Sequence, residues 1–309
     1  MTRYLSSKIL YMLISLFILA SATFFLMKII PGDPFQSEKA IPPEIKKQIM
    51  AYYGLDKPLP EQYVNYLKNL LTGDLGMSMK MQHTSVVSII NNSFIYSAQL
   101  GIVAIIVSVI VGLALGMVAA LHHRKFLDNA SMVLAVLGVS VPNFVLASLL
   151  QYVLGEKFGL FNVAGLNGPF DFVMPVIALS ALPIAFIARL TRSSMLEVLA
   201  SDYIKTARAK GLGKRVIMIR HALRNGILPV VTYVGPLTAN VITGSVVVEQ
   251  IFGIPGLGKY FVQSVSNRDY TLIMGITLFY AVILMAARFL TDVAYVFVDP
   301  RIKLGKGGK

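Results

Sequence analysis

The sequence has 309 residues, of which 56% are hydrophobic and 14% are charged, and its formal net charge is +13. This composition excludes an ordinary soluble domain and is typical of a membrane protein. The sequence contains no cysteine, which excludes a disulfide framework, a thiolate metal site and a cysteine nucleophile.

The basic residues are concentrated in a few connecting segments, which argues against nucleic-acid binding and for a fixed orientation in a membrane. The segments that hold 17 of the 28 Lys and Arg are 1–8, 122–129, 189–226 and 299–309. The remaining connecting segments hold nine, balanced by ten acids. Because positively charged connections stay in the cytoplasm, both termini are predicted to be cytoplasmic.

The first apolar run extends from Ile9 to Ile30 and predicts a membrane-spanning helix. A cleaved signal peptide is the alternative, since Ala20-Ser21-Ala22 resembles a cleavage site. The apolar run continues well past that site, which favours an uncleaved helix. Lys28, near its outer end, can extend its ammonium group to the interface.

Pro31-Gly32-Asp33-Pro34 stops this helix, and a region with two amphipathic patterns follows, at 42–54 and 60–71. The second apolar run, Phe94 to Leu121, contains Gly112-x-x-x-Gly116, a pattern that allows close helix packing. It ends at His122-His123, which we interpret as part of a basic turn in preference to a metal site.

Ala130 to Leu154 predicts the third span, with Pro142 inside it. A proline there leaves a carbonyl without its helical donor, so this span is either a wall of an aqueous path or a kinked packing helix. Gln151 lies deeper in the run and needs a polar partner.

The fourth and fifth spans, Phe172 to Ala188 and Ile227 to Val248, are interrupted by proline and glycine, as expected of a movable gate. Arg189 and Arg192 are expected to mark the cytoplasmic end of the fourth. The sixth, Thr271 to Val298, carries Arg288 and Asp292 four residues apart. That spacing favours a structural ion pair between them over a proton relay.

The polar stretch Ser201 to Pro229 separates the fourth and fifth spans and carries seven Lys or Arg against one acid. Ser201 is suited to begin a helix and Gly211 to end it. Small residues at 206, 207 and 209 would let another surface approach the backbone. The stretch therefore predicts either a short cytoplasmic helix that docks into a partner or a solvated basic loop that fixes topology.

Catalytic signatures are missing from the sequence. Residues 253–259, GIPGLGK, match the first seven places of a phosphate-binding loop, but the eighth is Tyr260 where Ser or Thr would hold magnesium. No H-E-x-x-H or nucleophile elbow is present. We therefore expect neither catalysis nor a metal site in this chain.

Several motifs, in order, resemble one family. The orders A-R-A-K-G-L (207–212) and R-H-A-L-R-N (220–225) are similar to the EAA loop of ABC-importer permeases in its peptide-transporter form. PGDP (31–34), GVSVPNF (138–144), I-F-x-x-P-G-L-G (251–258) and DPRI (299–302) also resemble the B-type permease of peptide importers. One departure is that Lys205-Thr206-Ala207 stands where the general pattern has Glu-Ala-Ala.

The resemblance implies an all-α, six-helix membrane protein of the type I ABC importer class. Its parts would be a first helix within 1–30, an outer helical loop at 31–93, a five-helix core at 94–298 with the coupling loop 189–226, and a cytoplasmic tail at 299–309. The chain would import oligopeptides without hydrolysing ATP itself, and it would bind no cofactor. ATP and magnesium would sit on two partner ATPase subunits. A second permease and an external peptide-binding protein would complete the complex.

The resemblance also implies three sets of functional residues. An ATPase would contact Asp202, Tyr203, Lys205, Thr206, Ala207, Arg208, Ala209, Lys210 and Gly211. The translocation path would be lined by Gln99, Asn143, Gln151 and Asn240. The outer gate, or a contact with the binding protein, would use Pro255, Gly256 and Gly258.

Alternatives remain for the cargo and for the class. Relatives of this type also carry dipeptides, nickel or other small solutes. An ion-driven secondary transporter would need a midspan acid, and the one candidate, Asp292, has Arg288 as an expected partner. A channel or membrane scaffold would not need the docking segment.

Overall fold

The computed structural model describes residues 2–30, 35 and 42–298, and these are helical apart from turns and a single antiparallel bridge between Met77 and Ser85. The prediction of an all-α protein is confirmed. The membrane-length and shorter α-helices are α1 (Thr2–Ile29), α2 (Pro43–Tyr52), α3 (Leu59–Leu71), α4 (Val86–Leu121), α5 (Phe126–Ser140), α6 (Asn143–Leu150), α7 (Val173–Ala200), α8 (Asp202–Ala209), α9 (Lys214–Val216), α10 (Arg224–Gly226), α11 (Leu228–Gly244), α12 (Val246–Phe252), α13 (Leu257–Asn267) and α14 (Tyr270–Val298). Two π-helices, η1 (Gln151–Lys157) and η3 (Ile217–Leu223), and a 3-10 turn, η2 (Pro169–Phe172), complete the order.

Four of these helical segments are long and apolar enough to cross a membrane: Ser6–Ile29, Val86–Leu121, Pro169–Ala200 and Tyr270–Val293. The pair α5 and α6–η1 adds a fifth if it is one broken span. The 17-residue α11 occupies the place of the predicted fifth span and lies beside α14, α4 and α7. The chain is therefore a multi-pass membrane protein.

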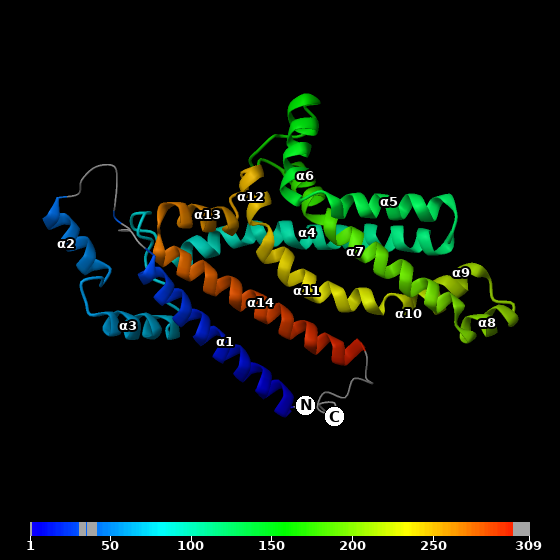
Figure 1. Cartoon of the computed structure of the whole chain (residues 1–309), viewed down its shortest axis with the longest axis horizontal. Coiled ribbons are helices and arrows are strands. Elements are labelled where there is room, and N and C mark those ends of the chain that lie inside the picture. The colour runs from blue at the N-terminus through cyan, green and yellow to red at the C-terminus, as the bar shows by residue number, and fades with distance from the viewer. Residues whose placement is uncertain (1, 31–34, 36–41, 299–309) are drawn as a thin grey trace.

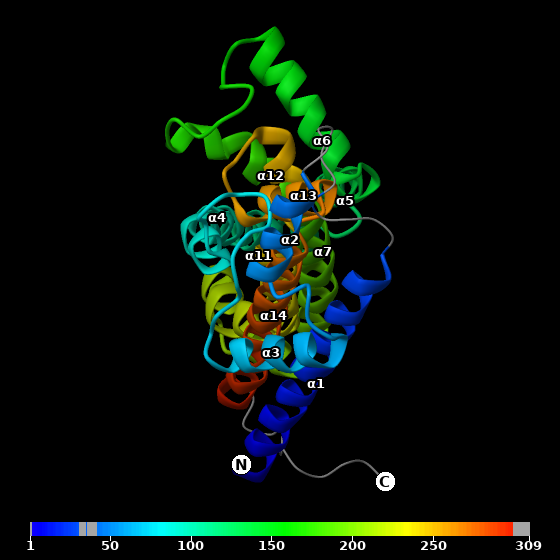
Figure 2. The ribbon, with the colours of Figure 1, turned by 90° about the vertical axis from the view of Figure 1, so that its left-hand side faces the viewer.

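The long helices run between two ends of the molecule (Figure 1). Helices α2 and α3 lie at one end, and α8 and α9 lie at the other, toward which α1 starts and α14 finishes. Viewed from the α3 end, α14 is central, with α4 and α1 on different sides of it (Figure 2).

Sequence signals explain where several helices begin. Ser85 precedes α4, and its hydroxyl accepts a hydrogen bond from the Ser88 amide at 3.1 Å, which satisfies one of the free donors of the first turn. Proline occupies the first turn of α2 and of α3, where a missing N–H costs nothing.

Close packing of α4 against α7 forms the centre of the core. Leu100 and Ala104 of α4 and Met174, Ala178 and Ile187 of α7 are buried in one cluster. A Cβ atom on Gly112 would lie 2.7 Å from the Ile187 side chain, and one on Gly116 would lie 2.5 Å from the Ala188 carbonyl oxygen. The predicted close approach at Gly112-x-x-x-Gly116 is confirmed, and its partner is α7.

Three span boundaries differ from the predictions. Helix α4 begins at Val86, before Phe94, and α7 continues to Ala200, so Arg189 and Arg192 lie inside α7 and do not mark its end. The predicted third span begins earlier, at Phe126, and it is interrupted at Pro142 as expected, since α5 and α6 meet there at an angle of 99°. The residue before a proline is driven out of the helical conformation, and Val141 is extended here.

The predicted ion pair within α14 is wrong. Asp292 forms its ion pair with Lys8 of α1, so the contact joins two spans that are far apart in the sequence. Arg288 is exposed and takes part in no ion pair among the described residues. The tail at 299–309 and the PGDP motif at 31–34 lie outside the described residues.

Candidate functional site

The predicted docking helix is present as α8. Ser201 is at its N-cap position, although the Ser201 hydroxyl donates to the Val198 carbonyl at 2.6 Å and caps no amide of α8. Gly211 follows the helix with φ of +76°, a conformation that favours glycine, and the Leu212 amide bonds to the Ala207 carbonyl at 3.3 Å. A helix of eight residues between two turns is therefore fixed at this end of the molecule.

One face of α8 is buried against the chain's own body. Ile204 is fully buried and Ala207 is 6% exposed, and both pack in a cluster with Met195 of α7 and with Ile217 and Ala222 of η3. The expectation that Ala207 would be open to a partner is wrong, because its side chain faces this cluster. The cluster instead attaches α8 to the end of α7.

The opposite face of α8 is exposed and carries a positive charge. Exposed residues there include Lys205, Thr206, Arg208, Ala209 and Lys210. The acid of the segment is partly neutralised, since Lys205 Nζ lies 2.8 Å from the Asp202 carboxylate. Gly211 is exposed as well, and a Cβ atom there would meet nothing within 4 Å.

The rest of the basic stretch folds back onto α7. Asn225 Nδ2 donates to the Tyr203 hydroxyl at 2.8 Å, which joins the two ends of the stretch. Gly226 is buried, and a Cβ atom there would lie 2.5 Å from Met195 Sδ. The stretch is therefore a packed helical unit and not a free solvated loop.

A buried ion pair, missed in the sequence, lies between α5 and α7. Asp128, 2% exposed, accepts from Arg192 Nε at 2.6 Å and from Arg192 Nη2 at 2.8 Å. The Arg124 amide donates to the same carboxylate at 2.9 Å, and His123 Nδ1 lies 3.3 Å from it. We name this group the Asp128 clamp. Two-point Arg–carboxylate geometry is directional, so the clamp holds the α4–α5 turn to the helix that leads into α8.

The predicted gate motif is organised around another acid that sequence reasoning missed, Glu249. Its side chain is fully buried, pairs with the Ser245 hydroxyl and accepts from the Gly258 amide at 2.8 Å. A Cβ atom on Gly256 would lie 2.3 Å from Glu249 Oε2 and 2.7 Å from Ser97 Oγ, so a side chain there would displace the Glu249 carboxylate or the Ser97 hydroxyl. The sequence feature that could have indicated this buried acid is the single Glu within the apolar run VVVEQIF.

The gate motif is a turn between α12 and α13, and it does not follow a strand. Gly253 ends α12 with φ of +64°, and Pro255 is partly buried just before α13. The Leu257 amide donates to Ser97 Oγ of α4 at 2.9 Å. This geometry lacks the strand–loop–helix context that a phosphate-binding loop requires.

The four residues predicted for the path are not brought together by hydrogen bonds. Gln99 is exposed on α4, and Asn143 is partly exposed at the start of α6. Gln151 has the polar partners it was expected to need, because its Nε2 donates to the carbonyls of Val163 and Ile251 at 2.8 and 2.9 Å. The side chain of Asn240 lies outside the described residues. Within the residues described, no group of three or more His, Asp or Glu is placed to hold a metal ion.

Two solved transporter structures have a similar fold. An amino acid ABC transporter, crystallised with histidines, gives a TM-score of 0.54 at 21% identity and covers 67% of this chain and 93% of its own. The MetNI methionine ABC transporter, in inward facing conformations, gives a TM-score of 0.57 at 17% identity and covers 69% and 97%. At these identities the likeness shows the fold, which is that of a type I importer permease.

Sequence comparison then identifies the family. Residues 112–304 match the model of binding-protein-dependent transport system inner membrane components, and residues 1–109 match the N-terminal model of the same components. The chain belongs to this family. The dipeptide transport system permease protein DppB of Bacillus subtilis is 49% identical over 308 residues, covering all of both chains. The oligopeptide transport system permease protein OppB of Escherichia coli is 42% identical over 98% of this chain and 100% of its own.

Proposed function

We propose that this chain is a permease subunit of an ATP-driven importer for short peptides, and that α8 is the joint through which ATPase subunits move it. The observation that carries the proposal is the arrangement of α8: its inner face is buried on α7 and η3, and its outer face is exposed and basic. A helix held in this way moves as one body with α7. Relatives named as dipeptide and oligopeptide permeases support the choice of cargo.

The expected complex contains this chain, a second permease, two ATPase subunits and an external peptide-binding protein. In this arrangement ATP and magnesium are bound by the ATPase subunits, and this chain supplies no cofactor site. A ligand shifts a conformational equilibrium only as far as it binds the two states differently. ATP binding therefore reaches the membrane helices only through a contact that changes with the ATPase state, and we assign that contact to α8.

The positive-inside pattern supports the orientation. The start of α1, the α4–α5 turn and the α8 end of the molecule carry the basic segments, and they lie toward the same end (Figure 1). We assign this end to the cytoplasm and the α2–α3 end to the outside of a bacterial-type plasma membrane. The binding protein would then meet α2, α3 and the turn at Pro255, whereas Gly256 and Gly258 are buried and cannot take part in that contact as the sequence predicted.

A bulky residue on the exposed face of α8 tests the proposal. Ala209→Trp should leave the chain folded, because Ala209 is exposed. It should lower ATP-dependent uptake of a labelled dipeptide in reconstituted vesicles by about tenfold or more, since a close contact of small residues cannot accept an indole ring. Uptake by the complete complex, with and without ATP, is the measurement.

Lys125→Trp is the matched control, because Lys125 is exposed in the α4–α5 turn at the same end of the molecule. It should transport at the unmodified rate. Equal uptake by the Ala209→Trp and Lys125→Trp complexes would refute the role of α8, and no ATP-dependent peptide uptake by any complex would refute the proposed function as a whole.

A further inference from the structure

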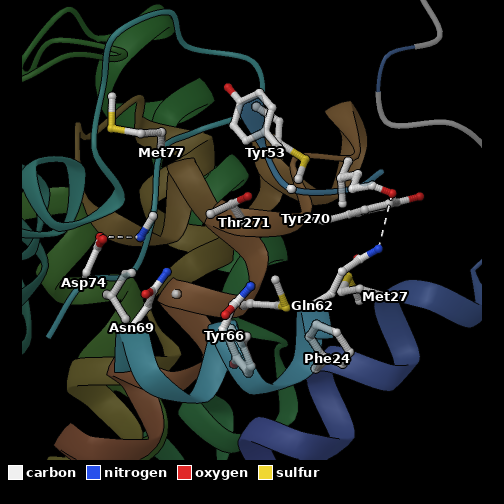
Figure 3. Close-up of a pocket in the computed structure, with 18 of the residues that line it drawn as sticks. Phe24, Met27, Tyr53, Gln62, Tyr66, Asn69, Asp74, Met77, Tyr270 and Thr271 are labelled. Atoms are coloured by element: carbon white, nitrogen blue, oxygen red, sulfur yellow. Dashed lines mark hydrogen bonds between the residues drawn. The ribbon is translucent and has the colours of Figure 1, made fainter. Parts of the chain in front are cut away.

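A cavity of about 440 Å³ lies at the end of the molecule opposite α8, between α1, α3, the turn after α3 and the first turns of α14. Figure 3 shows Phe24 and Met27 of α1 on one side of it, with Tyr66 and Asn69 of α3 along its floor. Its volume falls within the roughly 300–1,000 Å³ of small-ligand sites. Neither the docking helix nor the gate motif contributes to it.

The cavity has a cation and an anion among its lining residues. Lys28 follows Met27 on α1, and its Nζ donates to Gln62 Oε1 and lies 5.5 Å from the centre of the Phe24 ring. Asp74 lies across the cavity from Met27 in Figure 3, where its Oδ1 accepts from the Gly76 amide at 2.8 Å. Both side chains belong to exposed residues, so each is accessible to a ligand in addition to its protein partner.

Between these charges the wall is apolar and adaptable, with neutral polar groups at intervals. Its lining includes Tyr53, Tyr66, Met77, Met79, Tyr270 and Met274. Methionine is unbranched and polarisable and recurs on surfaces that accept varied apolar groups. Tyrosine adds large contact area at a low entropic cost. Such a wall accepts side chains of different shapes.

The wall next to α14 is fixed by a buried acid. Asp269, 1% exposed, pairs with the Ser78 hydroxyl and accepts from the amides of Met79 and Leu272, both at 3.1 Å. Tyr53 donates to the Ser78 carbonyl at 2.7 Å, and burial raises the pKa of this tyrosine, which keeps its hydroxyl protonated as a donor. The cavity is therefore pre-formed, and one of its walls is the start of a membrane span.

Opposite charges across an apolar, methionine-rich space match a ligand that has charges at both ends and variable side chains between them. We propose that this cavity binds a short zwitterionic peptide, with Lys28 holding its terminal carboxylate and Asp74 its terminal ammonium group. The site lies at the end assigned to the outside, so this inference rests on the proposed function. A peptide released there would be held at the start of α14 before it is transported.

Binding of modified dipeptides to charge variants tests the site. The probe is radiolabelled alanyl-phenylalanine, and the protein is the assembled transporter without its binding protein and without ATP. C-terminal amidation should weaken binding by about tenfold in the unmodified complex, because a charge-assisted hydrogen bond is lost, and should have no further effect in Lys28→Met. N-terminal acetylation should likewise weaken binding, but not in Asp74→Asn.

Asp56→Asn and Lys80→Met are the matched controls, since both residues are exposed in the same region and neither lines the cavity. They should retain the unmodified affinity and the full penalties for both modifications. The inference is overturned if no saturable binding occurs at millimolar peptide, or if the penalties persist in Lys28→Met and Asp74→Asn. It is also overturned if those two variants weaken only the docking of the binding protein. In each case ATP-dependent uptake by the complete complex shows whether the proposed function still stands.

Discussion

Single glycines decide how closely the membrane helices approach one another. Gly116 of α4 lies against the backbone of α7, where the Ala188 carbonyl oxygen and the Thr191 side chain occupy the space of a Cβ atom. Backbone atoms cannot rotate away as a side-chain terminus can, so α4 and α7 would have to separate to admit even a methyl group.

Gly116→Ala should therefore destabilise the protein by about 1–3 kcal/mol, the usual cost of overpacking a close contact. Thermal unfolding of the purified chain in detergent measures this effect. Ala114→Leu is the matched control, because Ala114 is exposed on the same helix and should tolerate a larger side chain. Equal melting temperatures for the Gly116→Ala chain and the unmodified chain would contradict this packing.

Local sequence patterns predicted the roles of some residues correctly and the contacts of others incorrectly. Gly112-x-x-x-Gly116 and Gly211 were predicted from local requirements, close approach and positive φ, and both hold. The partner of Asp292 could not be predicted, because a four-residue spacing suggests Arg288 while Lys8 arrives only through the packing of α1 on α14. The burial of Ala207 could not be predicted for a similar reason, since the residues that cover it come from α7 and η3.

Among the elements, α7 connects the membrane core to α8. The first half of α7 packs on α4, and its last turns hold Met195 against Ile204 and Gly226. The Asp128 clamp adds the α4–α5 turn to the same unit through Arg192. A displacement of α8 would therefore be passed to α4 and α5 as well as to α7.

Asp128→Ala should loosen this unit. Removing one partner of a buried ion pair leaves the other charge unpaired, and because Arg192 is partly exposed we expect a loss of about 2 kcal/mol in stability. Chemical denaturation of the purified chain measures it. The control is Glu197→Gln, an exposed acid of α7 with no ion pair among the described residues, which should change stability little. A loss as small as that of the control would show that the clamp does not hold α5 to α7.

The ends of a helix could be predicted where the thickness of the membrane determines them. They could not be predicted where packing against other helices determines them. The runs at α1 and α14 ended close to the predicted residues, because apolar length reflects membrane thickness. The 99° bend before Pro142 is different: a proline indicates a break, but the size of the bend depends on what α6 packs against. Helix α7 continues past Arg192, whose partner Asp128 lies on α5 and cannot be inferred from the sequence of α7 alone.

At the scale of the whole molecule, we assign different tasks to the two ends. The α8 end has a basic exposed face on a packed base, and the other end has a pre-formed cavity beside the start of α14. Helix α4 covers most of the distance between the two ends, and α7, α11 and α14 are in contact with it (Figure 1). In the function that we propose, the work of transport enters through the contact of the exposed face of α8 with an ATPase subunit.

The most direct test of that claim is cysteine cross-linking in the assembled transporter, which is straightforward because the chain has no cysteine of its own. Thr206→Cys places a thiol on the exposed face of α8, and Lys80→Cys places one on an exposed residue at the opposite end. We predict that the first thiol cross-links to an ATPase subunit, with a yield that changes when ATP is added, and that the second does not. Failure of the Thr206→Cys thiol to reach the ATPase, or its reaction with a membrane-impermeant reagent from outside the cell, would contradict that claim.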